Sequence, residues 1–295
     1  MDAAPMRYRL THRTLYTYHP PAIRARHFLH LLPRNRPGQR LDVATLAIEP
    51  PPSDRYDEFD YFGNHITSVD IDAPHDMFRA TVCADILIDP PARLERAGIA
   101  WEAVAQADTM PPEIAEFAVP TRLTGASDGV HALARRHFTP QADVMVATAA
   151  LNHHLYAIFR YRPGVTSVTT TGPAALAKRE GVCQDYAQAM LACLRAVGLP
   201  GRYVSGYLRS QTESADSGYS GAEQTHAWVS VWFGPLHGWV DFDPTNDLIV
   251  ADEHVTLAWG RDFTDVSPTC GIILGGRRHT LKVSVVLAPV IEAAP

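Results

Sequence analysis

Residues 181–199 read GVCQDYAQAMLACLRAVGL, and the rest of the chain is organised around this stretch. Its apolar side chains recur at spacings of three and four, which is typical of the buried face of a helix; they are Val182, Tyr186, Met190, Leu194 and Val197. Gly181 precedes the helix and Gly198 ends it, so Cys183 lies in the first turn. Free N–H groups and the helix dipole favour a thiolate there. Cys183 is therefore a candidate nucleophile, although this segment alone fits a small buried hydrophobic residue equally well.

Two short β-rich runs follow, at 225–233 and 239–246, separated by the turn sequence GPLHG at 234–238. This pattern predicts a hairpin, in which Asp243 can lie beside His226. Asp241 shares a strand face with Asp243, so alternation alone does not separate the two acids. A thiolate that attacks a carbonyl, an imidazole that transfers the proton and a carboxylate that orients the imidazole together form a nucleophilic triad. The order of these residue types predicts such a triad.

Four segments resemble the bacterial transglutaminase-like proteins, which are relatives of the papain-like cysteine enzymes. They are GVCQDYA at 181–187, RYVSGY at 202–207, HAWV at 226–229 and WVDFDPTN at 239–246. The resemblance covers most of the chain, including a β-rich N-terminal part. It implies that the nucleophile is Cys183, the base is His226 and the acid, immediately before Pro-Thr-Asn, is Asp243.

The predicted fold class is α+β, with a papain-like or transglutaminase-like core of helices packed on an antiparallel sheet. A β-rich domain at 1–92 precedes this core, which spans 93–295, and a strand region at 278–290 packs back on the N-terminal domain. Alternating apolar residues predict a strand at 78–88. Helices are expected at 128–137 and 144–159, and a short one ends at Arg179 just before the nucleophile.

Further site residues are expected around Cys183. Tyr161 is the candidate second oxyanion donor, with Gln184 as the alternative, because each lies close to the nucleophile helix in sequence. Tyr207 and Trp228 are candidate walls of a substrate groove, although strand aromatics also pack in cores. The Ser- and Gly-rich segment 210–224 has the composition of a lid.

Composition excludes several functions. The net charge of −6 and the lack of a basic stripe exclude general nucleic-acid binding, and the three arginines at 34–40 predict a solvated loop. The four cysteines form no metal spacing, so no metal or organic cofactor is expected. Neither a signal peptide nor a long apolar run is evident, which predicts a cytoplasmic protein without a membrane partner.

The predicted function is cysteine-dependent acyl transfer on peptide or glutamine-type amide bonds through a thioester. Water as acceptor gives a peptidase or amidase, which we prefer; a primary amine as acceptor gives a protein-glutamine gamma-glutamyltransferase. A non-catalytic protein-binding module with the same fold is the alternative from another class. Assembly into a homo-oligomer through the N-terminal β domain is a further hypothesis.

Overall fold

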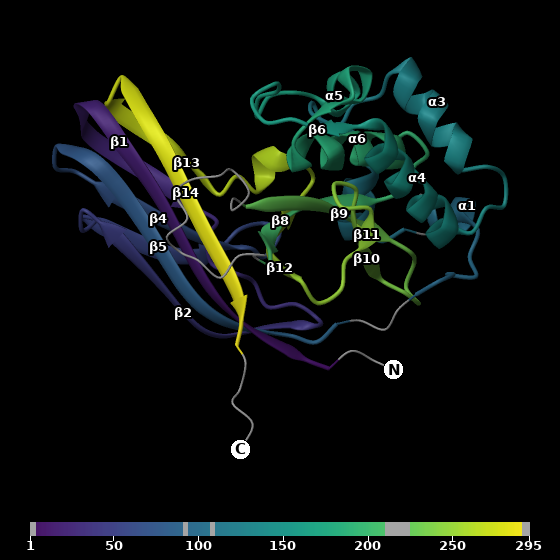
Figure 1. The fold of residues 1–295 in the computed structure, drawn as a ribbon, viewed down its shortest axis with the longest axis horizontal. Coiled ribbons are helices and arrows are strands. Elements are labelled where there is room, and N and C mark those ends of the chain that lie inside the picture. The colour runs from purple at the N-terminus through teal and green to yellow at the C-terminus, as the bar shows by residue number, and fades with distance from the viewer. Residues whose placement is uncertain (1–3, 91–93, 107–109, 210–224, 291–295) are drawn as a thin grey trace.

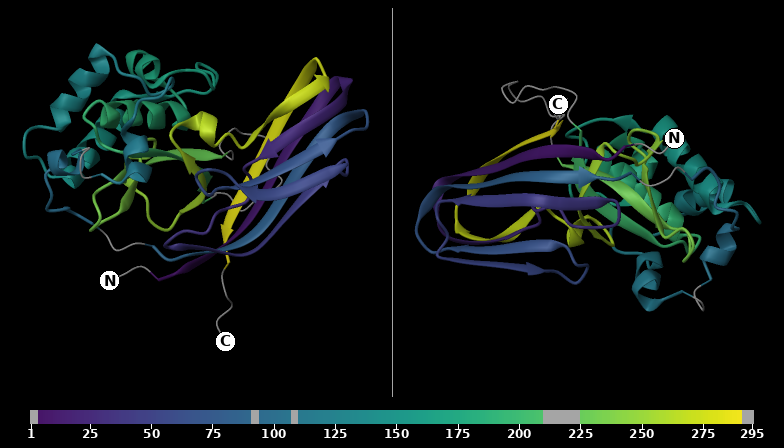
Figure 2. Two further views of the ribbon diagram at one scale, coloured as in Figure 1. Left: turned by 180° about the vertical axis from the view of Figure 1, so that it is seen from behind. Right: turned by 90° about the horizontal axis from the view of Figure 1, so that it is seen from below.

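The computed structural model describes residues 4–90, 94–106, 110–209 and 225–290. An N-terminal sheet and a mixed helix-and-sheet core lie side by side, with most of the helices on the side of the core away from that sheet (Figure 1). The same arrangement is clear from behind and from below (Figure 2). The segment 210–224, for which the sequence predicts a lid, lies outside the described residues.

Seven strands form the N-terminal sheet, in the order β2-β5-β1-β4-β3 with β13 and β14 also paired to β1. Their bounds are β1 (Met6–Leu29), β2 (Gln39–Glu49), β3 (Asp54–Phe59), β4 (His65–Ile71), β5 (His75–Ile88), β13 (Thr269–Gly275) and β14 (Arg278–Pro289). Strand β5 shows the predicted alternation, because its even-numbered residues from Phe78 to Ile88 are buried and Cys83 is exposed.

Strand β1 connects two halves of this sheet. Its residues 6–17 pair with β5 and 8–19 with β14, whereas residues 25–29 pair with β4 and 24–29 with β13. Pro20 and Pro21 separate the two halves and have no N–H to donate to a ladder. The strand therefore changes partners at these prolines, and β14, from the far end of the chain, completes the N-terminal sheet.

The core contains a five-stranded antiparallel sheet in the order β11-β10-β9-β8-β12. Its strands are β8 (Gly201–Leu208), β9 (His226–Trp232), β10 (Trp239–Asp243), β11 (Leu248–Ile249) and β12 (His254–Gly260). The other core elements are α1 (Trp101–Val104), α2 (Pro112–Ala115), η2 (Glu116–Ala118), α3 (Asp128–His137), α4 (Val144–Ile158), β6 (Arg160–Tyr161), α5 (Gly172–Lys178), β7 (Glu180–Gly181), α6 (Cys183–Arg195) and η3 (Phe263–Asp265).

Helix α6 is the centre of the core. Its apolar residues share one hydrophobic cluster with α3, α4 and the inner face of β9, represented by Met190, Leu194 and Val229. None of these three side chains is exposed to solvent. Burial of this face stabilises a 13-residue helix that would be marginal in isolation, and it holds the helix N-terminus at a constant position against the sheet.

The two parts of the molecule share a core and a hydrogen-bonded interface. Tyr207 of β8 packs in the N-terminal cluster, and its hydroxyl lies 2.9 Å from Nδ1 of His12. Strand β12 is the edge strand that faces the N-terminal domain, and the amide of Gln39 makes two 2.7 Å hydrogen bonds with the backbone of Thr256. Asn64 binds the backbone of Trp259 in the same reciprocal way. Side chains of the N-terminal domain thus satisfy the edge of the core sheet.

The arginine-rich loop at 34–40 is a correction to the sequence prediction. Arg34 is buried and donates to the carbonyl of Phe62, and Arg36 donates to Asp241 of the core at 3.0 Å. Arg36 therefore connects this loop to the core, whereas Arg40 is exposed and pairs with Asp42.

The predicted α+β class with a β-rich N-terminal region is confirmed. The helices at 128–137, 144–158 and 183–195 and the antiparallel pairing of β9 with β10 agree with the sequence patterns. No helix in the described ranges combines the length and the apolarity that crossing a bilayer requires.

Candidate active site

Cys183 is the first residue of α6, and the local sequence explains why the helix begins there. The carboxylate of Asp185 accepts a 2.8 Å hydrogen bond from the N–H of Val182, the residue before the helix, and a 2.7 Å bond from the hydroxyl of Thr166. A Cβ atom on Gly181 would lie 2.4 Å from Asp185, so this turn requires glycine. Asp185 therefore caps the helix, which leaves Cys183, partly exposed, at its N-terminal end.

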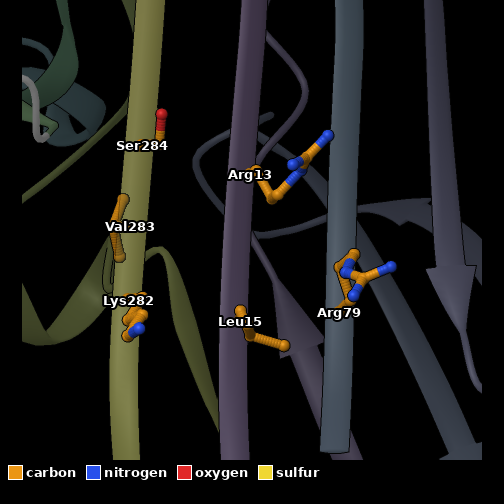
Figure 3. A pocket seen from close by; sticks show the side chains of 6 residues that line it. All are labelled: Arg13, Leu15, Arg79, Lys282, Val283 and Ser284. Atoms are coloured by element: carbon orange, nitrogen blue, oxygen red, sulfur yellow. The ribbon is translucent and has the colours of Figure 1, made fainter. Parts of the chain in front are cut away.

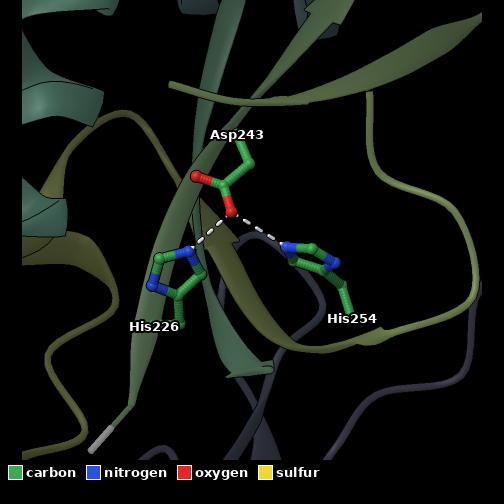
Figure 4. A group of neighbouring side chains, drawn as sticks. All are labelled: His226, Asp243 and His254. Atoms are coloured by element: carbon green, nitrogen blue, oxygen red, sulfur yellow. Dashed lines mark hydrogen bonds and ion pairs between the residues drawn. The ribbon is translucent and has the colours of Figure 1, made fainter. Parts of the chain in front are cut away.

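His226 and Asp243 come from neighbouring strands. Strands β9 and β10 are antiparallel, with Phe242 opposite Val229, and His226 lies at the start of one strand where Asp243 ends the other. Nε2 of His226 lies 2.8 Å from Oδ2 of Asp243 (Figure 4). The predicted hairpin thus brings the base and the acid together, and it leaves Nδ1 of His226 free for a different partner.

Asp243 is fully buried and accepts hydrogen bonds on both oxygens. The N–H groups of Thr245 and Asn246 donate to Oδ1, and the side-chain amide of Asn246 donates to Oδ2 at 2.7 Å. Burial alone would raise the pKa of Asp243, but the hydrogen bonds and charges of His226 and His254 outweigh it and hold the pKa far below its usual range. Asp243 is consequently a buried carboxylate that stays ionised.

Cys183 and His226 form the second contact of the triad. Burial lowers the pKa of His226, whereas the hydrogen bond to Asp243, the hydrogen bond to Cys183 and the charges of both residues raise it to about 10. His226 therefore lies between the buried Asp243 carboxylate and the sulfur of Cys183. A thiol hydrogen-bonded to an imidazole can pass its proton to the ring, attack a carbonyl as the thiolate and leave the imidazolium to deliver a proton.

Tyr161 lies beside the nucleophile through a parallel pairing of two short strands. Tyr161 of β6 is opposite Gly181 of β7, two residues before Cys183. Burial raises the pKa of the Tyr161 phenol, and the charges of Cys183 and Asp185 raise it further. Tyr161 as a whole residue is 50% exposed. By contrast, the amide nitrogen of Gln184 donates to the carbonyl of Val168 at 3.1 Å and is engaged by that loop.

Tyr207 and Trp228 do not line a groove, which corrects the sequence prediction for both. Tyr207 is fully buried and bonded to His12 across the domain interface. Trp228 is also fully buried; its ring lies 6.2 Å from the His226 ring and 5.1 Å from the His254 ring. Its indole N–H points at Asp241, 3.4 Å away. Both aromatic side chains are core residues, and only Trp228 lies against the site.

His254 is a residue that the sequence did not reveal. It begins β12 and is 2% exposed, and its Nε2 lies 3.0 Å from the same Oδ2 of Asp243 that His226 contacts (Figure 4). The strand sequence HVTLAWG carries no motif that marks this histidine. Only the pairing of β12 with the far edge of β8 brings it to Asp243.

The nitrogen and oxygen atoms of His226, Asp243 and His254 lie within 4.8 Å of one another, so their chemical types would suit a metal ion. A metal-bound histidine usually donates its other ring N–H to an acceptor. Nδ1 of His254 is buried and has no partner among the described residues, and the Asn246 amide already donates to Asp243. The group therefore fits two histidines hydrogen-bonded to one carboxylate better than a metal centre.

Two cavities among the described residues lie away from this site. One, of about 100 Å³, is a shallow depression on the outer face of the N-terminal sheet, lined by Arg13, Leu15, Arg79, Lys282, Val283 and Ser284 (Figure 3). The other, of about 470 Å³, lies between α3, α4 and α5. Neither cavity is lined by Cys183, His226 or Asp243. We identify the site from the contacts that these three side chains make with one another.

Comparisons with known proteins agree with the fold and identify the family. The family profile described as the bacterial transglutaminase-like N-terminal region matches residues 8–86, and the profile of the transglutaminase-like superfamily matches residues 131–244. An uncharacterized protein of Mycobacterium tuberculosis is 36% identical over 293 residues, which are 96% of this chain and 93% of that protein. This chain therefore belongs to the transglutaminase-like superfamily and carries the N-terminal region of its bacterial members.

Two further proteins are similar to this chain, one in part of its sequence and one in its fold. A protein-glutamine gamma-glutamyltransferase of Pseudomonas aeruginosa is 36% identical over 115 residues, which are 38% of this chain and 17% of that protein. The crystal structure of "a Putative Cysteine Protease from Cytophaga hutchinsonii" superimposes with a TM-score of 0.80 at 19% identity and covers 100% of this chain and 94% of that one. The second match extends the shared fold over both parts of the molecule.

Proposed function

We propose that this protein is a cysteine-dependent acyl-transfer enzyme that hydrolyses amide bonds of peptides or of glutamine-type side chains. The observation that carries the proposal is the position of His226, whose Nε2 lies 2.8 Å from Oδ2 of the buried Asp243 and which also hydrogen-bonds Cys183 at the N-terminus of α6. A histidine between a buried carboxylate and a thiol at a helix N-terminus is the arrangement that nucleophilic catalysis requires.

In the first step the Cys183 thiolate attacks the amide carbonyl, and negative charge develops on its oxygen. N–H groups at the N-terminus of α6 and the hydroxyl of Tyr161 are the donors proposed for that oxygen. Tyr161 suits this role because the residue is half exposed and interacts electrostatically with Cys183.

In the second step His226 protonates the departing amine or ammonia, the C–N bond breaks and a thioester to Cys183 remains. His226 is then neutral and can take a proton from the incoming acceptor. Asp243 does not exchange a proton in this scheme; its hydrogen bond to Nε2 keeps Nδ1 of His226 directed at Cys183 and stabilises the imidazolium.

Water is the acceptor that needs no binding site of its own, which is why we favour hydrolysis. Transamidation is the second candidate function, and it is supported by the 36% identity with the Pseudomonas aeruginosa gamma-glutamyltransferase over part of the core. With an amine as acceptor the same thioester gives a new amide bond instead of a free acid.

Turnover of glutamine-containing peptides, with and without an added primary amine, tests both functions. We expect release of free acid by the wild type, no turnover by Cys183→Ala, and full turnover by the matched control Cys83→Ala, because Cys83 is exposed on β5 of the N-terminal sheet. Incorporation of the amine in preference to water would favour the transferase. Turnover by Cys183→Ala equal to that of the wild type would contradict the mechanism.

Alkylation by iodoacetamide tests the site without a known substrate. We expect Cys183 to be labelled below pH 7 faster than Cys83, which serves as an exposed thiol in the same molecule, and His226→Ala to abolish the difference. Equal labelling of Cys183 and Cys83, unaffected by His226→Ala, would favour a non-catalytic binding module.

A further inference from the structure

We propose that His254 is a positioning residue for the acid of this site: its Nε2–H holds the Asp243 carboxylate in the orientation that supports the His226 imidazolium. The proposal rests on the function proposed above, because His254 would orient Asp243 within the proposed triad of Cys183, His226 and Asp243.

The geometry gives one oxygen two imidazole donors. Oδ2 of Asp243 lies 2.8 Å from Nε2 of His226 and 3.0 Å from Nε2 of His254, and the two rings approach it from different strands (Figure 4). An ionised carboxylate only accepts hydrogen bonds, so Nε2 of His254 must carry a hydrogen in either protonation state. His254 thereby gives Oδ2 a second hydrogen-bond donor, in a direction different from that of His226.

The Nδ1 atom of His254 makes no contact that would explain why a histidine occupies this position. Nδ1 is buried and has no hydrogen-bond partner among the described residues. An unpartnered buried polar atom is unfavourable, and an apolar side chain would fill the same space without it. The Nε2 contact with Asp243 is the feature that a histidine provides here and an apolar residue would not.

The strand that carries His254 is held from both edges. Strand β12 pairs with β8 on one edge, with His254 opposite Leu208. On the other edge, the amides of Gln39 and Asn64 bind the backbone of Thr256 and Trp259. The N-terminal domain therefore secures the element from which His254 reaches the acid.

Three groups face this cluster: Cys183 from α6, Asn246 from the turn after β10 and Trp228 from β9. The indole N–H of Trp228 points at Asp241, which pairs with Arg36. Without the Nε2–H of His254, Oδ2 of Asp243 loses one hydrogen-bond donor. The ionised carboxylate is then less stabilised, and its orientation toward His226 is less restricted. The thiolate–imidazolium pair would then persist over a narrower pH range.

The experiment compares His254→Leu with His254→Gln, because the glutamine amide nitrogen can replace Nε2–H whereas leucine cannot donate. The readout is the rate of Cys183 alkylation as a function of pH. We expect the lower pH limit of Cys183 alkylation to rise by about one pH unit in His254→Leu, which is about a tenfold lower rate at a pH below that limit. His254→Gln should restore the limit of the wild type. An unchanged limit in a folded His254→Leu, or equal effects of both substitutions, would overturn the proposal.

A second measurement needs neither a variant nor activity. In ¹⁵N-histidine NMR of the wild-type protein, Nε2 of His254 should carry a hydrogen that exchanges slowly with solvent. Nδ1 of the same ring should show no hydrogen bond. Hydrogen on Nδ1 alone would exclude the bond to Asp243 and overturn the proposal even if His254→Leu fails to fold. If instead Cys183 shows no enhanced reactivity while the tautomer is as expected, the proposed function fails and the contact stands.

Discussion

Nε2 of His226 and Oδ2 of Asp243 lie 2.8 Å apart, although 17 residues separate them in the chain. The hairpin of β9 and β10 brings them together, and the buried Trp228 packs beside the His226 ring. Asp243 has no exposed surface, so the interaction is little screened by water. In the proposed mechanism this pair orients the imidazole toward Cys183.

Asp243→Asn should slow both turnover and alkylation of Cys183. The amide carries no charge and can present an N–H to His226. The imidazolium then loses both the negative charge and the hydrogen-bond acceptor that stabilise it. We expect turnover to fall by roughly two to four orders of magnitude, as for a triad that has lost its acid. Asp241→Asn is the matched control, because Asp241 is also buried on β10 but pairs with Arg36. Equal losses in both variants would argue against Asp243 as the acid.

Stability should depend on His226 in a defined pH window. The pKa of His226 is about 10 in the folded protein, against about 6.5 in an unfolded chain. The folded state therefore binds the extra proton, and this contribution to stability is complete below about pH 6.5 and is lost as the pH rises through about 10. In urea denaturation, the difference in unfolding free energy between the wild type and His226→Gln should shrink from pH 6 to pH 10. A difference independent of pH would contradict this linkage.

Acid should weaken the domain interface through His12. Burial lowers the pKa of His12 to about 4, and its ring nitrogens contact Tyr207 and Thr14. Because an unfolded histidine binds a proton near pH 6.5, stability should decrease as the pH falls from about 6.5 towards 4. The midpoint of urea unfolding should therefore drop between pH 7 and pH 5. The midpoint of His12→Gln should decrease less over the same pH range. An equal decrease in both proteins would assign the acid sensitivity to other groups, such as His27, where burial also lowers the pKa to about 4.

Tyr161→Phe separates oxyanion stabilisation from activation of the nucleophile. The phenylalanine ring retains the packing but removes the hydroxyl, so we expect kcat to fall by about 10²-fold, as for loss of one oxyanion donor. Alkylation of Cys183 should stay at the wild-type rate, because His226 and Asp243 are unaffected. Tyr156→Phe, at an exposed position of α4, is a control that should leave both rates unchanged. Wild-type kcat in Tyr161→Phe would exclude the proposed role of this hydroxyl.

Local patterns were sufficient for several parts of this molecule. The spacing of Tyr186, Met190 and Leu194 predicts α6, because a helix must bury one face. The alternation along 78–88 predicts β5, because a half-buried strand must alternate. Family resemblance supplied the choice of Asp243 over Asp241, which alternation left open. These features depend on residues that are close in sequence or that stand in a recognisable motif.

Contacts between distant segments required the tertiary structure. Tyr207 and Trp228 have the residue types of a substrate groove, yet both are buried, because the N-terminal sheet covers one and the site itself covers the other. His254 carries no local signal, and its bond to Asp243 exists only because β12 joins the edge of the core sheet, where Gln39 and Asn64 hold it. The sequence by itself determined the helix that presents Cys183 and the strands that carry His226 and Asp243. The packing of two domains decided which side chains surround them, since burial and hydrogen bonding at an interface depend on both surfaces at once.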